Sequence, residues 1–319
     1  MATVGILEER YESHEIERAV IEAAGHRVLD IPPEREDWPD WMKSADAILV
    51  NLTPITEREL ESLPACRALC RYGAGFDAID VRAAAKRGIA VINQPAVTVE
   101  EVSDHTIALW LACMRQILPR DAAVRRGEWN TPTPAATRRL HGTVFGIVGF
   151  GLIGRAVARK VSPFEPEEIL VYDPYVDDEV IRRHGCVSAT LDDLLSRSST
   201  VSLHTVLNDE TRNMINAESL ARMKRGTCLL NTSRGGLMDV DAVADALESG
   251  QLHSAGLDVF PTEPPGDLRV FRLPTAVVTD HCAWYSVQSQ VDLQRTTAES
   301  AVRFLAGDED LSIVNRDLM

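Results

Sequence analysis

The sequence of 319 residues contains no apolar run that approaches the ~18 positions of a membrane-spanning helix, so we expect no membrane segment. It also lacks a basic block, and its net charge is −15. Nucleic-acid binding without sequence preference requires Lys and Arg side chains that neutralise phosphates, which makes that function a poor candidate. The N-terminal segment has neither the basic start nor the long apolar core of a signal peptide. We therefore expect a cytoplasmic protein with no nucleic-acid or membrane partner.

Cysteine is sparse and scattered through apolar stretches. Cys66 and Cys70 have a spacing that suits a metal, but no second Cys/His pair with suitable spacing accompanies them. We expect buried thiols in a reducing compartment and no metal site. The six cysteines are Cys66, Cys70, Cys113, Cys186, Cys228 and Cys282.

The length exceeds one typical domain and fits two. In the first part, short apolar runs alternate with helical patterns such as residues 15–24 and 81–87, which indicates an α/β fold with a largely parallel sheet. The expected strands are residues 3–7, 28–31, 47–52, 68–72 and 89–92.

Residues 98–118 form a long helical pattern between Pro95 and Pro119, with Thr98 as a candidate cap. Apolar residues occupy much of its circumference, so the helix is expected to be buried. A core helix and a subunit interface explain this pattern equally well.

From residue 143 to 280 the alternation of strands and helices is clearer. Thr190, Asn216 and Asp239 are placed to cap helices, and residues 286–305 form a last amphipathic helix. Six strands with intervening helices predict a doubly wound parallel sheet. These strands are expected at residues 144–148, 168–172, 200–204, 227–231, 254–258 and 276–279.

A glycine-rich turn joins the first of these strands to the following helix. In this G-x-G-x-x-G pattern, Gly149 permits a tight turn, Gly151 allows close approach to a pyrophosphate, and Gly154 allows helix and strand to pack closely. Leu152 and Ile153 open the helix, whose N-terminal amides would face the phosphates. A strand–helix turn that binds nothing is the alternative, and its strand and helix context disfavours it.

The next strand ends at Asp173, 19 positions beyond Gly154. A carboxylate at this position accepts hydrogen bonds from ribose hydroxyls and repels a 2′-phosphate, so NAD (NADH) is favoured over NADP. An exposed acid without a ligand is the alternative interpretation.

Three polar residues each follow a predicted strand end, at Arg234, Glu263 and His281. Ligands bind at the C-terminal edge of such a sheet, so the three are expected to meet there. His281 would exchange a proton with a 2-keto or 2-hydroxy acid, and Glu263 would orient it and raise its pKa. Arg234 would hold the substrate carboxylate with its planar fork. Taken singly, each also suits an ordinary structural role.

Further residues are expected around this site. Asp258 would bind the nicotinamide amide, and the loop that begins His204-Thr205-Val206 would cover the cofactor, although His204 also suits a structural role. The loop Tyr72-Gly73-Ala74-Gly75 offers backbone amides for an anion, with an ordinary turn as the alternative. Thr232 and Ser233, which precede Arg234, complete the predicted cofactor contacts.

Together these segments resemble the D-isomer-specific 2-hydroxyacid dehydrogenase family over nearly the whole chain. The resemblance implies a formate/glycerate dehydrogenase-like fold of two Rossmann-like or flavodoxin-like domains. Residues 1–96 with 287–319 would form a substrate-binding domain around an NAD-binding domain of residues 97–286. It further implies that Thr98 contacts the cofactor and that the helix from Thr98 forms a homodimer.

Two stretches resemble the C-terminal-binding-protein branch, namely Gly75-Phe-Asp-Ala-Ile-Asp80 and His281-Cys-Ala-Trp284-Tyr-Ser286. In that branch the tryptophan walls the keto-acid pocket, so Trp284 implies an apolar or thioether substrate tail. The leading hypothesis is an NAD(H)-dependent oxidoreductase that interconverts a D-2-hydroxy acid and a 2-keto acid. The alternatives are an NADH-sensing dimeric, corepressor-like protein with vestigial catalysis, and an enzyme of the same fold acting on formate or phosphite.

Overall fold

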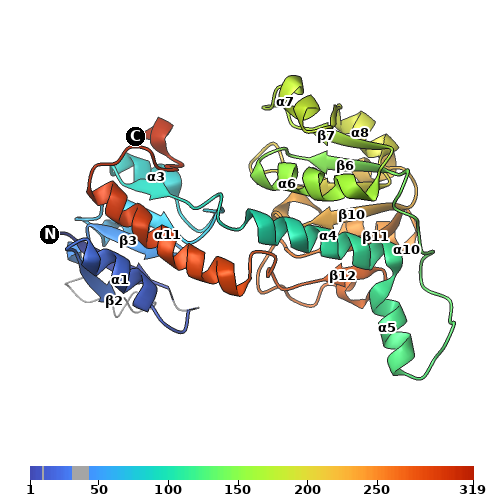
Figure 1. Ribbon diagram of the computed structural model, residues 1–319, viewed down its shortest axis with the longest axis horizontal. Coiled ribbons are helices and arrows are strands. Elements are labelled where there is room, and N and C mark those ends of the chain that lie inside the picture. The colour runs from blue at the N-terminus through green and yellow to red at the C-terminus, as the bar shows by residue number, and fades with distance from the viewer. Residues whose placement is uncertain (9–10, 31–42) are drawn as a thin grey trace. The chain divides into compact units, whose positions relative to one another are not determined.

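The computed structural model describes residues 1–8, 11–30 and 43–319, and its contacts divide the chain into two compact units (Figure 1). Unit 1 comprises Met1–Thr98 and Tyr285–Met319, and unit 2 comprises Val99–Trp284. The domain boundaries expected from the sequence lie two residues from each of these junctions.

Unit 1 is built on a parallel five-stranded sheet of order β2-β1-β3-β4-β5, which is the flavodoxin-like order. Helix α11 (Val287–Leu305) lies beside α1 (Glu15–Ala23) and contacts β3 and β4 (Figure 1). Position 31 of the predicted strand 28–31 lies outside the described residues. The strands are β1 (Thr3–Leu7), β2 (Arg27–Asp30), β3 (Ala47–Val50), β4 (Ala68–Arg71) and β5 (Ala90–Ile92). The remaining helical segments are α2 (Glu57–Glu61), α3 (Val81–Lys86) and the 3-10 turn η6 (Arg316–Leu318).

Unit 2 is built on a parallel seven-stranded sheet of order β12-β11-β10-β9-β6-β7-β8. The chain moves outward from β6 through β7 to β8 and then returns to β9 on the other side of β6. This order is that of a Rossmann sheet with one added strand, and its topological switch point lies between β6 and β9. The strands are β6 (Val144–Val148), β7 (Glu168–Tyr172), β8 (Val187–Ser188), β9 (Thr200–Leu203), β10 (Thr227–Asn231), β11 (Leu252–Leu257) and β12 (Ala276–Val278).

Helices cover both faces of this sheet, which explains why its central strands are buried apolar runs rather than alternating ones. Thr190, Asn216 and Asp239 accept backbone N–H bonds at the starts of α8, α9 and α10, as predicted. The helices are α4 (Val99–Arg115), α5 (Ile117–Arg125), α6 (Leu152–Val161), α7 (Asp178–Arg183), α8 (Leu191–Arg197), α9 (Ala217–Arg222) and α10 (Val240–Glu248). The 3-10 turns are η3 (Ser162–Phe164), η4 (Gly235–Leu237) and η5 (Arg269–Arg272).

The single helix predicted for residues 98–118 is wrong, because two helices meet there. Gln116 adopts a left-handed conformation with φ 55°, which ends α4 and begins α5. Pro119 therefore lies in the first turn of α5, where a missing N–H is tolerated, instead of ending the segment. In α4, Trp110 and Met114 are buried against the sheet of unit 2, which accounts for its apolar surface. None of the helices in the described ranges combines the length and apolar character of a membrane span.

The glycine turn after β6 has three glycines with different surroundings. Gly149 has φ +93°, and a Cβ there would lie 2.6 Å from the backbone of His204, across the switch point. A Cβ on Gly154 would collide with the carbonyl oxygen of Gly149, so this glycine brings α6 against β6. Gly151 has no heavy atom within 4 Å of a Cβ position. The fold therefore requires Gly149 and Gly154, whereas the space at Gly151 is left open.

This difference predicts opposite effects on stability. Gly154→Ala forces α6 away from β6 and should destabilise unit 2 by about 2 kcal/mol, which corresponds to a Tm decrease of roughly 4–8 °C. Gly151→Ala should leave the Tm within about 2 °C of the parent. Thermal unfolding followed by circular dichroism measures both. Equal Tm values for the two variants would contradict the packing role of Gly154.

Candidate active site

Three neighbouring strands of unit 2 deliver the three predicted reacting residues to one edge of the sheet. Strands β10, β11 and β12 are adjacent and parallel, so their carboxyl ends lie side by side. Arg234 follows β10, Glu263 follows β11 and His281 follows β12. Residues that are far apart in the sequence therefore emerge at the same edge.

His281 and Glu263 are in direct contact. The Nδ1 atom of His281 lies 2.5 Å from Oε2 of Glu263, and both side chains are about one-third exposed. The other carboxylate oxygen, Oε1, accepts a hydrogen bond of 3.0 Å from the backbone N–H of Phe260. The carboxylate is thus held by the backbone on one side and presented to the imidazole on the other.

The electrostatic environment keeps Glu263 ionised. Its partial burial acts to raise the pKa, but the hydrogen bonds from His281 and Phe260 and the charges of His281 and Arg234 outweigh this and hold the pKa of Glu263 below its ordinary value. An ionised carboxylate only accepts hydrogen bonds, so Nδ1 of His281 carries the proton in this contact. Nε2 of His281 is then the nitrogen that remains for a substrate.

The backbone of His281 is also unusual. Its φ is 56°, in the left-handed region that costs a non-glycine residue about 1–2 kcal/mol. The backbone N–H of His281 donates a hydrogen bond of 2.8 Å to the carbonyl oxygen of Asp258. Strained backbone at a site of reacting groups persists where the surrounding contacts over-determine it.

A close approach between two loops accounts for the glycine after Arg234. A Cβ on Gly235 would collide with the backbone carbonyl of Phe260, so the Arg234 loop packs directly against the loop that leads to Glu263. The side chain of Asn231 holds the Arg234 loop by two hydrogen bonds. Its Oδ1 accepts a hydrogen bond of 3.0 Å from Ser233 N, and its Nδ2 donates a hydrogen bond of 2.9 Å to Arg234 O. Neither the Phe260 amide nor the Gly235 contact was foreseen, because sequence spacing does not report which loops touch.

Apart from Thr98, the residues predicted to contact a cofactor follow the strands β6, β7, β9, β10 and β11 in the sequence. Asp173 is oriented by two backbone amides, from Phe150 at 2.7 Å and Tyr175 at 2.9 Å. Ser233 donates to the carbonyl oxygen of Thr205 at 2.6 Å, which ties the loop after β10 to the loop after β9. In the same region Leu152 and Val206 are exposed, Ile153 packs partly into the core, and Thr232 is buried against Thr106.

His204 follows β9 and is held from one side by Ser202, whose hydroxyl lies 2.8 Å from Nε2. Burial lowers the pKa of His204 to about 3, so its ring is neutral near physiological pH. A neutral, tethered imidazole matches the structural role that the sequence left open.

Asp258 has partners that the sequence did not reveal. Its carboxylate is fully buried and accepts hydrogen bonds from the Thr279 hydroxyl at 2.6 Å, Cys282 N at 3.0 Å and Ala283 N at 3.1 Å. Three internal donors occupy most of its capacity as an acceptor. Asp258 therefore holds the turn that carries His281, whatever else it contacts.

The predicted substrate-loop residues lie in unit 1, after β4. Tyr72 is buried and its hydroxyl donates to Glu17 at 2.9 Å, so only its backbone is available to a ligand. Gly73 has φ +113°, which favours glycine in this loop, while Ala74 accepts a hydrogen bond from Asn93 at its carbonyl. Gly75 and Thr98 also belong to unit 1, whereas the half-buried Trp284 ends unit 2.

Comparison with known proteins agrees with this architecture. Residues 107–283 match the model of the D-isomer specific 2-hydroxyacid dehydrogenase, NAD binding domain. A glyoxylate reductase from Korarchaeum cryptofilum is 36% identical over 313 residues, 95% of this chain and 94% of that protein. A D-3-phosphoglycerate dehydrogenase from Mycobacterium tuberculosis is 37% identical over 277 residues, 86% of this chain, and the chain spans only about half of that relative, with 52% matched.

A solved structure shares the fold over nearly the full length. The crystal structure of D-lactate dehydrogenase from Aquifex aeolicus complexed with NAD and lactic acid has a TM-score of 0.85 and 27% identity, and covers 96% of each chain. The family model covers more than half of the sequence, and the archaeal relative matches almost all of it. The chain therefore belongs to the D-isomer-specific 2-hydroxyacid dehydrogenase family.

Proposed function

We propose that this chain is an NAD(H)-dependent oxidoreductase that interconverts a D-2-hydroxy acid and its 2-keto acid. The observation that carries the proposal is the 2.5 Å contact between Nδ1 of His281 and the ionised Glu263, which leaves Nε2 for a substrate. Arg234 follows β10, the neighbour of the strand that precedes Glu263, and supplies a cation for the carboxylate of such an acid. An acid–base group and an anion holder are what this redox reaction requires of a protein.

The residues of unit 2 fit a dinucleotide. The open space at Gly151 lies at the N-terminus of α6, where backbone N–H groups favour a pyrophosphate. Asp173 is held beside the glycine turn by the Phe150 amide, in the position that suits ribose hydroxyls. When bound, the nicotinamide would supply or accept the hydride, and the loop His204–Val206 would help hold it.

The roles of the protein's own groups follow from their chemistry. In reduction, Nε2 of His281 gives a proton to the carbonyl oxygen of the substrate, and in oxidation it removes the proton from the hydroxyl. Glu263 fixes the ring orientation and stabilises the imidazolium by its charge. Arg234 binds the substrate carboxylate, and the backbone amides of Gly73–Gly75 are proposed as anion contacts in their own loop.

The substrate tail and the family branch are finer proposals. Trp284 follows the His281 turn and supports a pocket for an apolar or thioether tail, as in the C-terminal-binding-protein branch. The relatives described above are a reductase and dehydrogenases by name, so they do not favour the NADH-sensing alternative with vestigial catalysis.

A homodimer and a cytoplasmic location are also proposed. In α4, the expected dimer helix, the large apolar residues pack inside unit 2. The exposed apolar residues belong to α5 and the following loop, namely Ile117, Leu118, Val124 and Trp129. We therefore propose that α5 contributes the apolar surface of a dimer. All six cysteines are free thiols, which supports a reducing compartment.

His281→Ala should remove the acid–base group and lower kcat by about 10²–10⁴-fold, while the Kd for NADH stays within about twofold. Glu263→Gln keeps the shape of the partner without its charge and should give an intermediate loss. NADH oxidation with a panel of 2-keto acids measures turnover, and fluorescence titration measures NADH binding. His141→Ala, at an exposed histidine of unit 2, is the control. Turnover retained by His281→Ala would refute the proton role.

Two adjacent glycines allow a matched test of the Arg234 loop. Gly235→Ala collides with the Phe260 backbone and separates Arg234 from Glu263, so kcat/KM should fall by roughly 10–100-fold. Gly236→Ala meets first the Leu207 side chain, at 2.8 Å, which can rotate away, and should change kcat/KM less than about threefold. If both variants are equally active, the close approach of the two loops is not required for catalysis.

Asp173→Ala should reduce the preference for NADH over NADPH. Loss of hydrogen bonds to a charged group predicts a decrease in kcat/KM with NADH of about tenfold or more, with no comparable loss for NADPH. Asp178→Ala, an exposed acid in the first turn of α7, is the matched control. An unchanged ratio of kcat/KM for the two cofactors would count against the ribose contact.

A further inference from the structure

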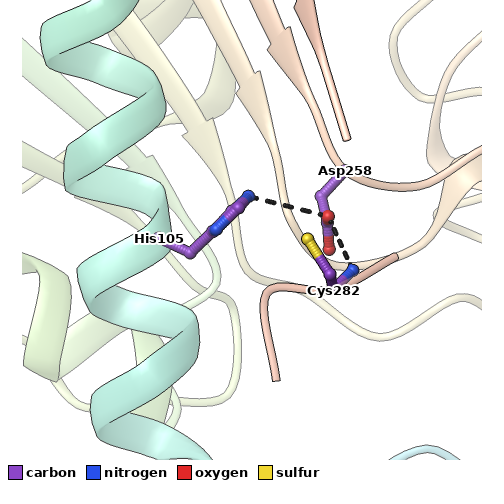
Figure 2. Close-up of side chains that lie close together, drawn as sticks. All are labelled: His105, Asp258 and Cys282. Atoms are coloured by element: carbon purple, nitrogen blue, oxygen red, sulfur yellow. Dashed lines mark hydrogen bonds and ion pairs between the residues drawn. The ribbon is translucent and has the colours of Figure 1, made fainter. Parts of the chain in front are cut away.

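His105, Asp258 and Cys282 form a cluster, and Cys282 belongs to the turn that carries His281 (Figure 2). Their potential ligand atoms lie within 4.8 Å of one another, as in a metal site. Their contacts are instead those of a hydrogen-bond network, since the Asp258 oxygens already accept from Thr279, Cys282 and Ala283. Burial, with the nearby acids, raises the pKa of the Cys282 thiol to about 11, which disfavours the thiolate that a metal needs.

The direction of each hydrogen bond in this network is determined by its chemistry. The Thr279 hydroxyl has one proton and donates it to Oδ1 of Asp258 at 2.6 Å. Its oxygen must therefore accept in the 3.0 Å contact with Nε2 of His105. It follows that Nε2 of His105 carries a proton and directs it toward Thr279.

His105 also approaches Asp258 itself. Figure 2 shows the ring reaching from α4 toward the carboxylate, with Nε2 at 3.6 Å from Oδ1. The side chain of His105 is about one-fifth exposed. A residue early in α4 thereby contacts the acid at the end of β11.

Asp258 accepts hydrogen bonds from three consecutive residues of the turn that carries His281. Its carbonyl oxygen accepts from His281 N at 2.8 Å, Oδ1 accepts from Cys282 N and Oδ2 accepts from Ala283 N. These bonds hold His281 at φ 56°. A rotation of the Asp258 carboxylate would break two of them and release the strained backbone.

We propose that His105 is a positioning residue for His281. His105 donates a hydrogen bond to the Thr279 hydroxyl and so orients it toward the Asp258 carboxylate. The carboxylate, oriented in turn by Thr279, accepts hydrogen bonds from the turn that carries His281. The turn then places the His281 ring against Glu263. This inference rests on the proposed acid–base role of His281. The effect of His105 on His281 passes through Thr279 and Asp258, which are the groups that His105 contacts in this network.

The test compares two substitutions of His105. His105→Phe keeps a planar ring and removes the donor, whereas His105→Gln places an amide N–H near the position of Nε2 and retains a donor. Loss of one hydrogen bond worth about 1 kcal/mol predicts a fall in kcat of roughly 3–10-fold for His105→Phe. The KM for the 2-keto acid and the Kd for NADH should stay within about twofold, and His105→Gln should recover most of kcat. His141→Phe is the control for replacing a histidine ring.

Three other outcomes would contradict the proposal that His105 positions His281. Unchanged kcat in His105→Phe shows that the donor is not needed. Equal losses of kcat in the Phe and Gln variants, together with a lowered Tm, assign His105 to packing alone. A weakened Kd for NADH with kcat unchanged assigns the cluster to cofactor binding. Absence of turnover in the parent protein, by contrast, refutes the proposed function itself and is recognised before any variant is compared.

Discussion

The contact between His281 and Glu263 is the interaction on which the candidate site depends. It requires a carboxylate that stays ionised, and the hydrogen bonds from His281 and Phe260, with the charge of Arg234, provide this despite partial burial. It also requires a left-handed backbone at His281, which is maintained by hydrogen bonds that the backbone N–H groups of this turn donate to Asp258. When both conditions hold, Nδ1 of His281 faces an ionised carboxylate and therefore carries the proton. Nε2 of His281 is then left for a substrate.

Parallel strand order brings these groups together. Because β10, β11 and β12 are neighbours with the same direction, loops separated by many residues share one edge of the sheet. The loops pack backbone against backbone at glycines, because any side chain would collide there. Gly149 lies against the backbone of His204, and Gly235 lies against the backbone of Phe260. The site is therefore a property of backbone packing as much as of its charged side chains.

Much of this arrangement could be predicted from the sequence. Apolar runs and helix caps located the strands and helices of unit 2 closely, because those signals are local. The doubly wound order then implied that Arg234, Glu263 and His281 share an edge. Where the outcome depended on one residue's backbone, as at Gln116, the pattern of apolar residues carried no signal and two helices were predicted as one.

Other features were beyond sequence reasoning for a different reason. The partners of Asp258 come from α4 and from the segment after β12, and the Tyr72 hydroxyl turns to Glu17 inside unit 1. Such contacts depend on side-chain directions after folding, which spacing along the chain does not determine. Asp258 could be predicted as a strand-end acid, but the hydrogen bonds that it accepts from the His281 turn could not.

We propose that unit 2 assembles His281, Glu263 and Arg234 for hydride transfer between NAD(H) and a 2-keto acid. The most direct measurement follows the label from NADH carrying deuterium at the transferable C4 position, with mass spectrometry of the product. We expect a 2-hydroxy acid with deuterium on C2, because the hydride passes directly between the two molecules. Turnover with the label released to water, or no labelled hydroxy acid from any keto acid offered, would contradict it.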